Sequence, residues 1–287
     1  MAPIPTTVIV GSGRLGHGIG AALVSRGIRV TFAVRRLGKN LPAAQGPFGI
    51  AETYRGARWI LIATPDHAIW STASTLSELG VVGPSSVVLH LSGVHDRSVL
   101  KPLAFSGAAL GSFHPLQAFA IPVTAASRLP GSYAGLEGDP AAVRAGRRLA
   151  RLLGMVALPI PAGAKPAYHA AATFAATYVA VVYDVAVEIA VEAGVGLKHA
   201  RAMFLPLLQG TVSNLKLLPP AHALTGAIRR GDVATVRSHL AALSKDHREL
   251  YRVLGRRALA IAKRTSTTPD RLAEIGRLLM GGPGKTG

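Results

Sequence analysis

The chain has 287 residues, no cysteine, and a formal charge of +18 from 32 basic and 14 acidic residues. This length allows two domains, and the lack of cysteine excludes disulfides and thiolate metal sites. The positive charge favours phosphate or carboxylate ligands, but no basic helix interleaved with aromatic residues accompanies it. We therefore expect a small anionic ligand, no nucleic acid and no metal.

The first half of the chain alternates short apolar runs with helical patterns. Near-continuous apolar strands separated by helices are typical of a parallel sheet that is covered on both faces. The fold class is therefore predicted as α/β, with an N-terminal Rossmann-type, doubly wound, mostly parallel sheet. The predicted strands are residues 6–11, 28–34, 58–65, 85–93, 107–115, 131–138 and 154–161, and helices are predicted over 14–27 and about 140–153.

Beyond Pro161 the pattern changes to amphipathic and alanine-rich helices without a convincing strand. We predict a dinucleotide-binding domain at residues 1–162 and an all-α substrate and dimerisation domain at 163–287. The start of the chain lacks the charged region and long apolar run of a secretory signal, which favours a cytoplasmic protein.

Residues 167–195 form a long, alanine-rich apolar stretch. It carries His169, Asp184 and Glu188, and a lipid-spanning helix seldom tolerates three ionisable groups. We expect a helix buried inside protein and no membrane contact. Its small residues allow close helix packing, so we expect a homodimer through the helical domain.

A glycine-rich motif, "VIVGSGRLG", follows the first predicted strand and opens the first helix. Gly11, Gly13 and Gly16 have the spacing of a dinucleotide-binding loop: the first permits a tight turn, the second a close approach of the pyrophosphate, and the third helix packing. The helix N-terminus supplies free N–H groups for the phosphates. The predicted loop is Gly11, Ser12, Gly13, Arg14, Leu15 and Gly16.

Two arginines end the second predicted strand, in "VTFAVRR". Proteins that bind NAD place an acidic residue there for the ribose 2′-hydroxyl. Arg35 or Arg36 would instead pair with a 2′-phosphate. We therefore predict NADP(H) as the cofactor, with Arg35 favoured because it lies nearer the strand end.

Polar residues also follow the next three predicted strands, at the edge where doubly wound folds bind ligands. Thr64, Pro65 and Asp66 are predicted to lie near the cofactor. Ser92 and Gly93 are predicted to face the nicotinamide or a substrate carboxylate. His114, beyond the following strand, is predicted to orient substrate.

The entry to the helical domain reads "AKPAYHAAATFAATY". Lys165, His169 and Thr173 occur at four-residue steps, which places them on one helix face. An ammonium and an imidazole one turn apart can polarise a carbonyl oxygen and donate a proton. The predicted catalytic residues are therefore Lys165, His169, His114 and Ser92. The alternative is an exposed lysine and a core histidine.

The glycine-rich start, "HLSG", "GSFHPLQAF", the "K-x-x-x-H-A-A" helix entry and "ALTGAIRRGD" together resemble a family of Rossmann-like NADP-binding oxidoreductases. Its members carry a C-terminal helical domain of unknown function. The family is similar to the wider group of ketopantoate reductase, pyrroline-5-carboxylate reductase and 3-hydroxyisobutyrate dehydrogenase. The resemblance covers nearly the whole chain.

The resemblance implies roles for further residues. Lys165 matches the catalytic lysine of the β-hydroxyacid members, whereas His169 replaces their asparagine. Ala176, Thr177 and Ala227 also depart from the expected pattern, and these differences affect the substrate. The implied substrate-binding residues are Asn214, Thr225, Arg229 and Arg230.

The leading hypothesis is an NADP(H)-dependent oxidoreductase that reduces a small carbonyl compound bearing a carboxylate, such as a ketopantoate-like 2-oxo acid. One alternative is an imine reductase resembling pyrroline-5-carboxylate reductase. The other is a non-catalytic NADP-binding sensor or assembly protein.

Overall fold

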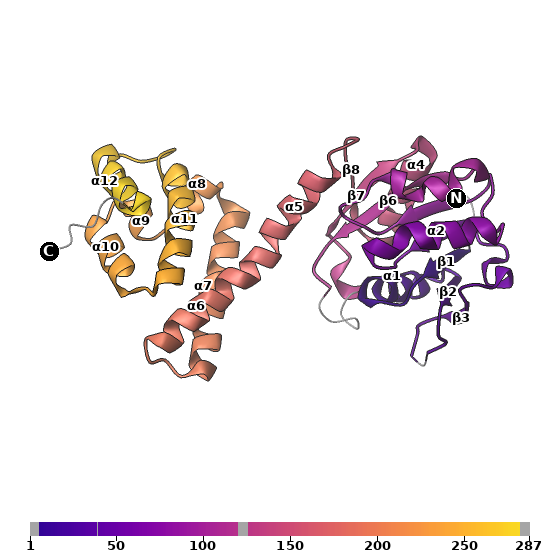
Figure 1. Ribbon diagram of the computed structural model, residues 1–287, viewed down its shortest axis with the longest axis horizontal. Helices are drawn as coiled ribbons and strands as arrows, with labels where there is room; N and C mark the ends of the chain where they lie inside the picture. The colour runs from indigo at the N-terminus through magenta and orange to yellow at the C-terminus, as the bar shows by residue number, and fades with distance from the viewer. Residues whose placement is uncertain (1–5, 39, 120–125, 282–287) are drawn as a thin grey trace. The chain divides into compact units, whose positions relative to one another are not determined.

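The computed structural model describes residues 6–38, 40–119 and 126–281 (Figure 1). The prediction that the chain starts without a secretory signal depends partly on residues 1–5, which lie outside the described residues. The chain divides into two compact units, Met1–Thr177 and Tyr178–Gly287. The predicted boundary at residue 162 precedes the helix α5 (Lys165–Ala175), which the structure groups with the first unit.

An eight-stranded sheet forms the first unit, with the strand order β3-β2-β1-β4-β5-β6-β7-β8. All neighbouring strands are parallel except β6 and β7, which are antiparallel. This confirms the predicted Rossmann-like, mostly parallel sheet. The strands are β1 (Thr7–Val10), β2 (Val30–Val34), β3 (Ala44–Pro47), β4 (Trp59–Ile62), β5 (Val87–His90), β6 (Ala109–Leu116), β7 (Tyr133–Gly138) and β8 (Val156–Pro159).

Alternate residues of the central strands point to two separate cores, because side chains alternate across a pleated strand. Ile9 of β1 packs in one core and Val8 and Val10 in the other. Helices α1 and α4 contribute to the first core, and η1, α2 and η3 to the second. The sheet is thus covered on both faces. These helices are α1 (Arg14–Val24), η1 (Ala51–Tyr54), η2 (Asp66–Ala68), α2 (Ile69–Glu78), η3 (Arg97–Ser106) and α4 (Pro140–Leu153).

Strand β6 is observed over Ala109–Leu116, close to the predicted range of 107–115. Its first half pairs with β5, where His90 lies opposite Ser112, and its second half pairs with β7, where Leu116 lies opposite Tyr133. The prediction that His114 lies beyond this strand was wrong. His114 lies inside β6, because pairing with β7 keeps the backbone extended beyond the end of β5.

The described residues of the second unit form helices and connecting turns without a strand, which confirms the predicted all-α C-terminal region. Val236, Leu259 and Ile275 belong to its main core. Val187, Ala190 and Ala200 form a smaller core. Its helices are α6 (Thr177–Glu192), α7 (Leu197–Leu217), α8 (Pro220–Ala223), α9 (Ala227–Arg230), α10 (Val233–Ala242), α11 (Lys245–Ala262) and α12 (Pro269–Met280).

The alanine-rich stretch forms two helices rather than one. Helix α5 ends at Ala175, and α6 begins at Thr177. Only Val187 and Ala190 of α6 are buried. The expectation that this stretch is buried inside protein was wrong for the single chain. The small core of Val187, Ala190 and Ala200 covers only part of α6, and the other apolar side chains of this helix stay at least partly exposed.

By length and composition, the stretch Lys165–Glu192 is the one candidate membrane span among the described residues, with a mean hydropathy of 1.7. A single such helix is weak evidence of a span. Glu188 and Glu192 both approach the imidazole of His247 at 3.3 Å. These ionisable groups are costly inside a bilayer.

Candidate active site

The glycine-rich loop has the geometry of a dinucleotide-binding turn. Gly11 has φ +102°, and a Cβ atom there would meet the carbonyl oxygen of Ala63 at 2.9 Å. A Cβ on Gly16 would meet the carbonyl oxygen of Gly11 at 2.6 Å, whereas a Cβ on Gly13 would meet nothing within 4 Å. The first and third glycines are thus required by the fold. The second leaves open space beside the backbone, as a pyrophosphate requires.

Helix α1 begins at this loop without a side-chain cap. The first N–H groups of a helix have no partner inside it, so they can bind phosphate oxygens. Ser12 and Arg14 are exposed at this end, whereas Leu15 packs against the core. The loop therefore fits the phosphates of a dinucleotide through its backbone.

Arg35 and Arg36 directly follow β2 and are both exposed. Neither has a hydrogen-bond or ion-pair partner within the described part of the chain. Thr64, which follows β4, has a buried hydroxyl without a partner among the described residues. Pro65 and Asp66 follow it on the surface, at the start of η2. These groups follow β2 and β4, the two strands that flank β1, and they could bind a phosphorylated cofactor.

Lys165 is completely buried, at 0 % exposure. Its Nζ atom donates to the carbonyl oxygen of Ser92 at 2.8 Å and to the hydroxyl of Ser112 at 3.2 Å. The first residue of α5 is thereby joined to the turn after β5 and to β6. Burial lowers the pKa of Lys165 from 10.5 to about 8, against the opposing charges of Glu137 and two aspartates.

The turn after β5 is held by its own polar groups. The hydroxyl of Ser92 accepts hydrogen bonds from the N–H groups of Val94 and His95, at 3.3 and 3.2 Å. His90 accepts a hydrogen bond from the Ser92 N–H, and its other ring nitrogen lies 3.1 Å from the carbonyl oxygen of Asp96. Burial and Lys165 lower the pKa of His90 to about 3, so its ring is neutral. The Ser92 hydroxyl thus supports the turn.

Two imidazoles converge on Gly93. A Cβ there would meet Nδ1 of His169 at 2.3 Å and Nε2 of His114 at 2.8 Å. The ring centroids of these histidines are 5.5 Å apart. Nδ1 of His169 is buried without a partner among the described residues. This atom is available to a bound molecule, and leaving it unpaired is costly.

Tyr168 orients His114 from behind. Its hydroxyl lies 3.1 Å from Nδ1 of His114, and the room for its ring comes from Gly135, where a Cβ would meet the hydroxyl oxygen at 2.6 Å. Burial raises the pKa of Tyr168, so the hydroxyl keeps its proton. Burial, then the charges of Lys165 and His169, lower the pKa of His114 to about 4.

The lowered pKa makes the His114 ring neutral, so one of its two nitrogens carries a proton. A phenol can donate to Nδ1 or accept from it, so the contact with Tyr168 fits either tautomer. When the phenol donates, Nε2 carries the proton and presents an N–H donor toward Gly93.

Glu137 supplies a carboxylate close to Lys165. It lies in β7, is 9 % exposed, and accepts a 2.8 Å hydrogen bond from the Arg97 N–H. Burial raises its pKa, which the Arg97 hydrogen bond and Lys165 partly oppose. The charges of Lys165 and Glu137 thus influence each other, although no ion pair joins the two side chains among the described residues.

The structure brings together Lys165, His169, His114 and the turn at Ser92, as the sequence predicts, but it does not test their roles. The predicted substrate residues belong to the second unit. Asn214 and Thr225 are exposed there, and Arg229 reaches the carbonyl oxygen of Thr265 at 3.5 Å. Their role in binding substrate stays a prediction, as does that of Arg230.

Sequence reasoning missed Tyr168, Glu137 and His90. Tyr168 directly precedes His169, but a residue one position away projects about 100° round a helix, so spacing gave no reason to select it. Glu137 is an isolated acidic residue in an apolar strand, a signal for a buried charge that needs a partner.

Residues 132–258 match the family model described as "Domain of unknown function (DUF2520)". The match covers 127 of the 287 residues, which is less than half of the chain. The DUF2520 match starts next to β7 and ends in α11, so it includes Lys165, Tyr168 and His169. None of the proteins with a curated description matches the chain in sequence.

The similarity to solved structures extends over nearly the full length of the chain. Protein TM1727 of Thermotoga maritima has a TM-score of 0.72 at 21% identity, covering 90% of this chain and 99% of its own. BF3122 of Bacteroides fragilis, named as a proposed NADP oxidoreductase, has 0.71 at 21%, covering 91% and 98%. Pyrroline carboxylate reductase of Plasmodium falciparum, with NADP bound, has 0.61 at 10%, covering 90% and 98%.

These likenesses establish the fold of the chain. They confirm the expected Rossmann-like domain followed by a helical region, which the chain shares with proteins named as an NADP oxidoreductase and a pyrroline carboxylate reductase.

Proposed function

We propose that the protein is an NADP(H)-dependent oxidoreductase that reduces a small carbonyl compound carrying a carboxylate. The observation that carries this proposal is that the glycine loop and the histidine cluster lie at the same edge of the sheet. The loop follows β1 and Gly93 follows β5, which is two strands away in the same parallel sheet. Since adjacent strands lie about 4.8 Å apart, roughly 10 Å separates them along the edge.

The cofactor assignment rests on three observations of this chain. The space at Gly13 admits a pyrophosphate, the Thr64 hydroxyl lacks a partner among the described residues, and Arg35 is free after β2. NADP and NADPH carry the 2′-phosphate that an unpaired guanidinium binds well. The similarity to a reductase with NADP bound supports the same assignment.

NADPH, when bound, supplies a hydride to the substrate carbon. In the tautomer in which Tyr168 donates to Nδ1, His114 donates an Nε2–H hydrogen bond to the substrate oxygen and orients it. His169, on the other side of Gly93, donates the proton to that oxygen as negative charge develops there. Lys165 adds a buried positive charge that stabilises the negative charge on the substrate oxygen. Ser92 holds the turn after β5 in place through its hydroxyl. For the second unit, the resemblance implies that Arg229 or Arg230 binds a substrate carboxylate and that Asn214 and Thr225 are further substrate contacts.

The substrate panel that tests this function contains 2-oxo acids and cyclic imines, with NADPH oxidation followed by absorbance. We expect oxidation with a 2-oxo acid such as ketopantoate. His114→Ala and His169→Ala should lower kcat by about a hundredfold while NADPH affinity is unchanged. Near wild-type turnover in both variants would remove the histidines from catalysis.

An imine reductase is the second candidate, and the similarity to pyrroline carboxylate reductase favours it. Oxidation with cyclic imines alone would select it. Tight NADPH binding without oxidation of any compound would favour the sensor or assembly protein.

We also propose that the protein is a homodimer through its helical unit. Large apolar side chains on α6 and α7 are exposed in the single chain, and contiguous apolar patches mark interfaces. A second copy of the chain is the expected partner, because it carries the same apolar surface on α6 and α7 and a two-fold dimer pairs identical surfaces. Light scattering after size exclusion should give twice the chain mass. The exposed side chains are Tyr178, Val179, Val181, Val182, Val191, Leu197, Met203, Leu205, Leu207, Val212, Leu215 and Leu217.

A further inference from the structure

The second unit contains a hollow of about 440 Å³ between α10, α11 and α12. Its size is that of a small-ligand pocket. It lies apart in the chain from the glycine loop and the histidine cluster, which belong to the first unit. The lining residues are Arg237, Leu240, Ala241, Arg248, Arg252, Glu274, Arg277, Leu278 and Gly281.

Four arginines and a single carboxylate line this hollow, so its charge is strongly positive. Arg237 pairs with Glu274 at 3.4 Å. Arg248 donates to the carbonyl oxygen of Leu243 at 2.8 Å. Arg252 and Arg277 have no hydrogen-bond or ion-pair partner within the described residues. The hollow therefore holds cationic groups that the chain itself does not neutralise.

Two of these guanidinium groups are also partly desolvated. The Nε atoms of Arg248 and Arg252 are buried and lack a hydrogen-bond partner in the part of the chain that is described. Burying a charged donor is costly unless an anion compensates it. A negatively charged ligand beside these arginines would supply that compensation.

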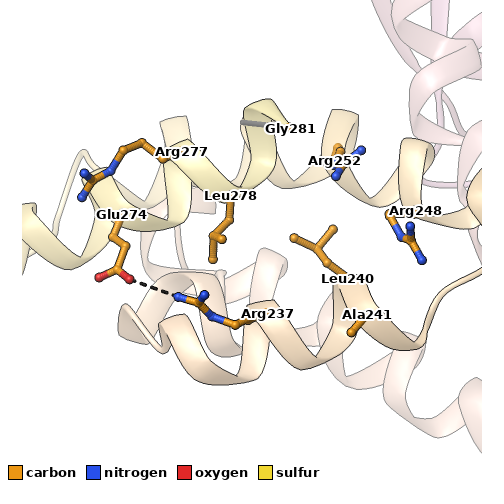
Figure 2. A pocket seen from close by; sticks show the side chains of 9 residues that line it. All are labelled: Arg237, Leu240, Ala241, Arg248, Arg252, Glu274, Arg277, Leu278 and Gly281. Atoms are coloured by element: carbon orange, nitrogen blue, oxygen red, sulfur yellow. Dashed lines mark hydrogen bonds and ion pairs between the residues drawn. The ribbon is translucent and has the colours of Figure 1, made fainter. Parts of the chain in front are cut away.

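Polar and apolar groups are separated within the hollow. Figure 2 shows Leu240 of α10 and Leu278 of α12 facing each other in its middle, with Arg248 and Arg252 toward one end and the Arg237–Glu274 pair toward the other. A ligand with an anionic head and an apolar body matches this arrangement. Its head would lie at Arg248 and Arg252, and its body between the leucines.

The positive charge continues past the hollow along α11. Lys245, Arg248, Arg252 and Arg256 recur at three- and four-residue steps, so they share one helix face. All four line a second, adjoining hollow of about 300 Å³. Like charges at this spacing repel each other, and a bound anion would relieve that repulsion at Arg248 and Arg252, which line both hollows.

We propose that this hollow binds a small, soluble organic phosphate monoester with an apolar body. A phosphate monoester carries a charge of nearly −2 at neutral pH and three acceptor oxygens. Such a ligand therefore suits two guanidinium groups better than a ligand with a single carboxylate group does. The two leucines give the organic part a contact that inorganic phosphate lacks. The site is separate from the proposed NADP(H) site and does not depend on it.

Calorimetric titration of the full chain tests this site, with phenyl phosphate as the probe and inorganic phosphate for comparison. Phenyl phosphate should bind one site per chain, about tenfold more tightly than inorganic phosphate. Saturating NADPH should leave this binding unchanged. Displacement of phenyl phosphate by NADPH would overturn the proposal, because the probe would then occupy the cofactor loop.

Arg252→Gln is the decisive variant, since Arg252 has no partner in the described chain whose loss would weaken the fold. It should reduce phenyl phosphate affinity about tenfold. Arg257→Gln is the matched control, because Arg257 is exposed on the same helix and lines neither hollow. Arg277→Gln on α12 provides a second reading if Arg252→Gln does not fold.

Equal losses in the control and in the Arg252 or Arg277 variant would show diffuse charge attraction and overturn the site. Binding only to a DNA duplex, or only to phosphatidylcholine vesicles containing phosphatidic acid, would overturn it as well. The vesicle arm separates a lipid phosphate from a soluble one.

Discussion

The buried ammonium of Lys165 donates to the carbonyl oxygen of Ser92 across 2.8 Å, which joins helix α5 to the turn after β5. This contact places a positive charge behind two imidazoles. It also explains why the pKa of His114 falls to about 4 and that of His90 to about 3, since the lysine adds to the effect of burial at both. The site is therefore built around one buried charge.

Replacing Lys165 should change the pH dependence of stability. The folded-state pKa is about 8 and the ordinary value is 10.5. Between these values the unfolded chain holds a proton that the folded chain has lost, so stability rises with pH. The free-energy cost of burying the charged lysine is fully present below pH 8 and is relieved by about pH 10.5.

Lys165→Met removes this titration. Relative to the variant, wild type should gain about 3 kcal/mol in its free energy of unfolding between pH 7.5 and 10.5. Urea unfolding at several pH values measures the difference. A constant difference would show that Lys165 does not titrate in this range.

Arg35→Ala should weaken NADPH binding by about ten- to a hundredfold, because a charge-assisted hydrogen bond to the 2′-phosphate is lost. NADH affinity should change little. Arg36→Ala tests which arginine is responsible. Arg29→Ala, at the opposite end of β2, removes the same charge at an exposed position and should leave both affinities unchanged. Equal losses for NADPH and NADH would contradict the assignment.

Gly13→Ala and Gly16→Ala should fail in different ways. A Cβ on Gly13 meets no atom within 4 Å, so the variant should fold normally yet lose NADPH affinity, because the methyl group occupies the space for the pyrophosphate. A Cβ on Gly16 meets a backbone oxygen at 2.6 Å, so that variant should lower the melting temperature. Differential scanning calorimetry with and without NADPH separates the two effects. Unchanged NADPH affinity in Gly13→Ala would argue against the loop as a phosphate site.

Tyr168→Phe should lower kcat by about tenfold while NADPH affinity stays constant, because His114 loses the hydroxyl that keeps its proton on Nε2. Nitrogen NMR of the imidazole reports the tautomer directly. In wild type, we expect Nε2 to be the protonated nitrogen across the pH range from 6 to 8, because the pKa of about 4 keeps the ring neutral and the phenol is proposed to donate to Nδ1. Protonation at Nδ1 in wild type would reverse the assigned donor.

Strand positions in the first unit were largely predictable from sequence. Buried parallel strands are continuous apolar runs, and glycines mark their ends. Strand β3 was not predicted, because "AQGP" contains no apolar run, and its pairing with β2 alone makes it a strand. Strand β6 was predicted over 107–115, and the partner of its second half, β7, follows only from the tertiary structure.

The sequence by itself determined the glycine loop, the arginines after β2, and the four-residue step from Lys165 to His169, because each follows from local spacing. Tertiary structure alone decided that Lys165 is buried against Ser92 and Ser112, and that the hydroxyl of Tyr168 lies against His114. These contacts join residues more than 50 positions apart. Their protonation states depend on burial and on neighbouring charge, which the folded chain creates and local sequence does not encode.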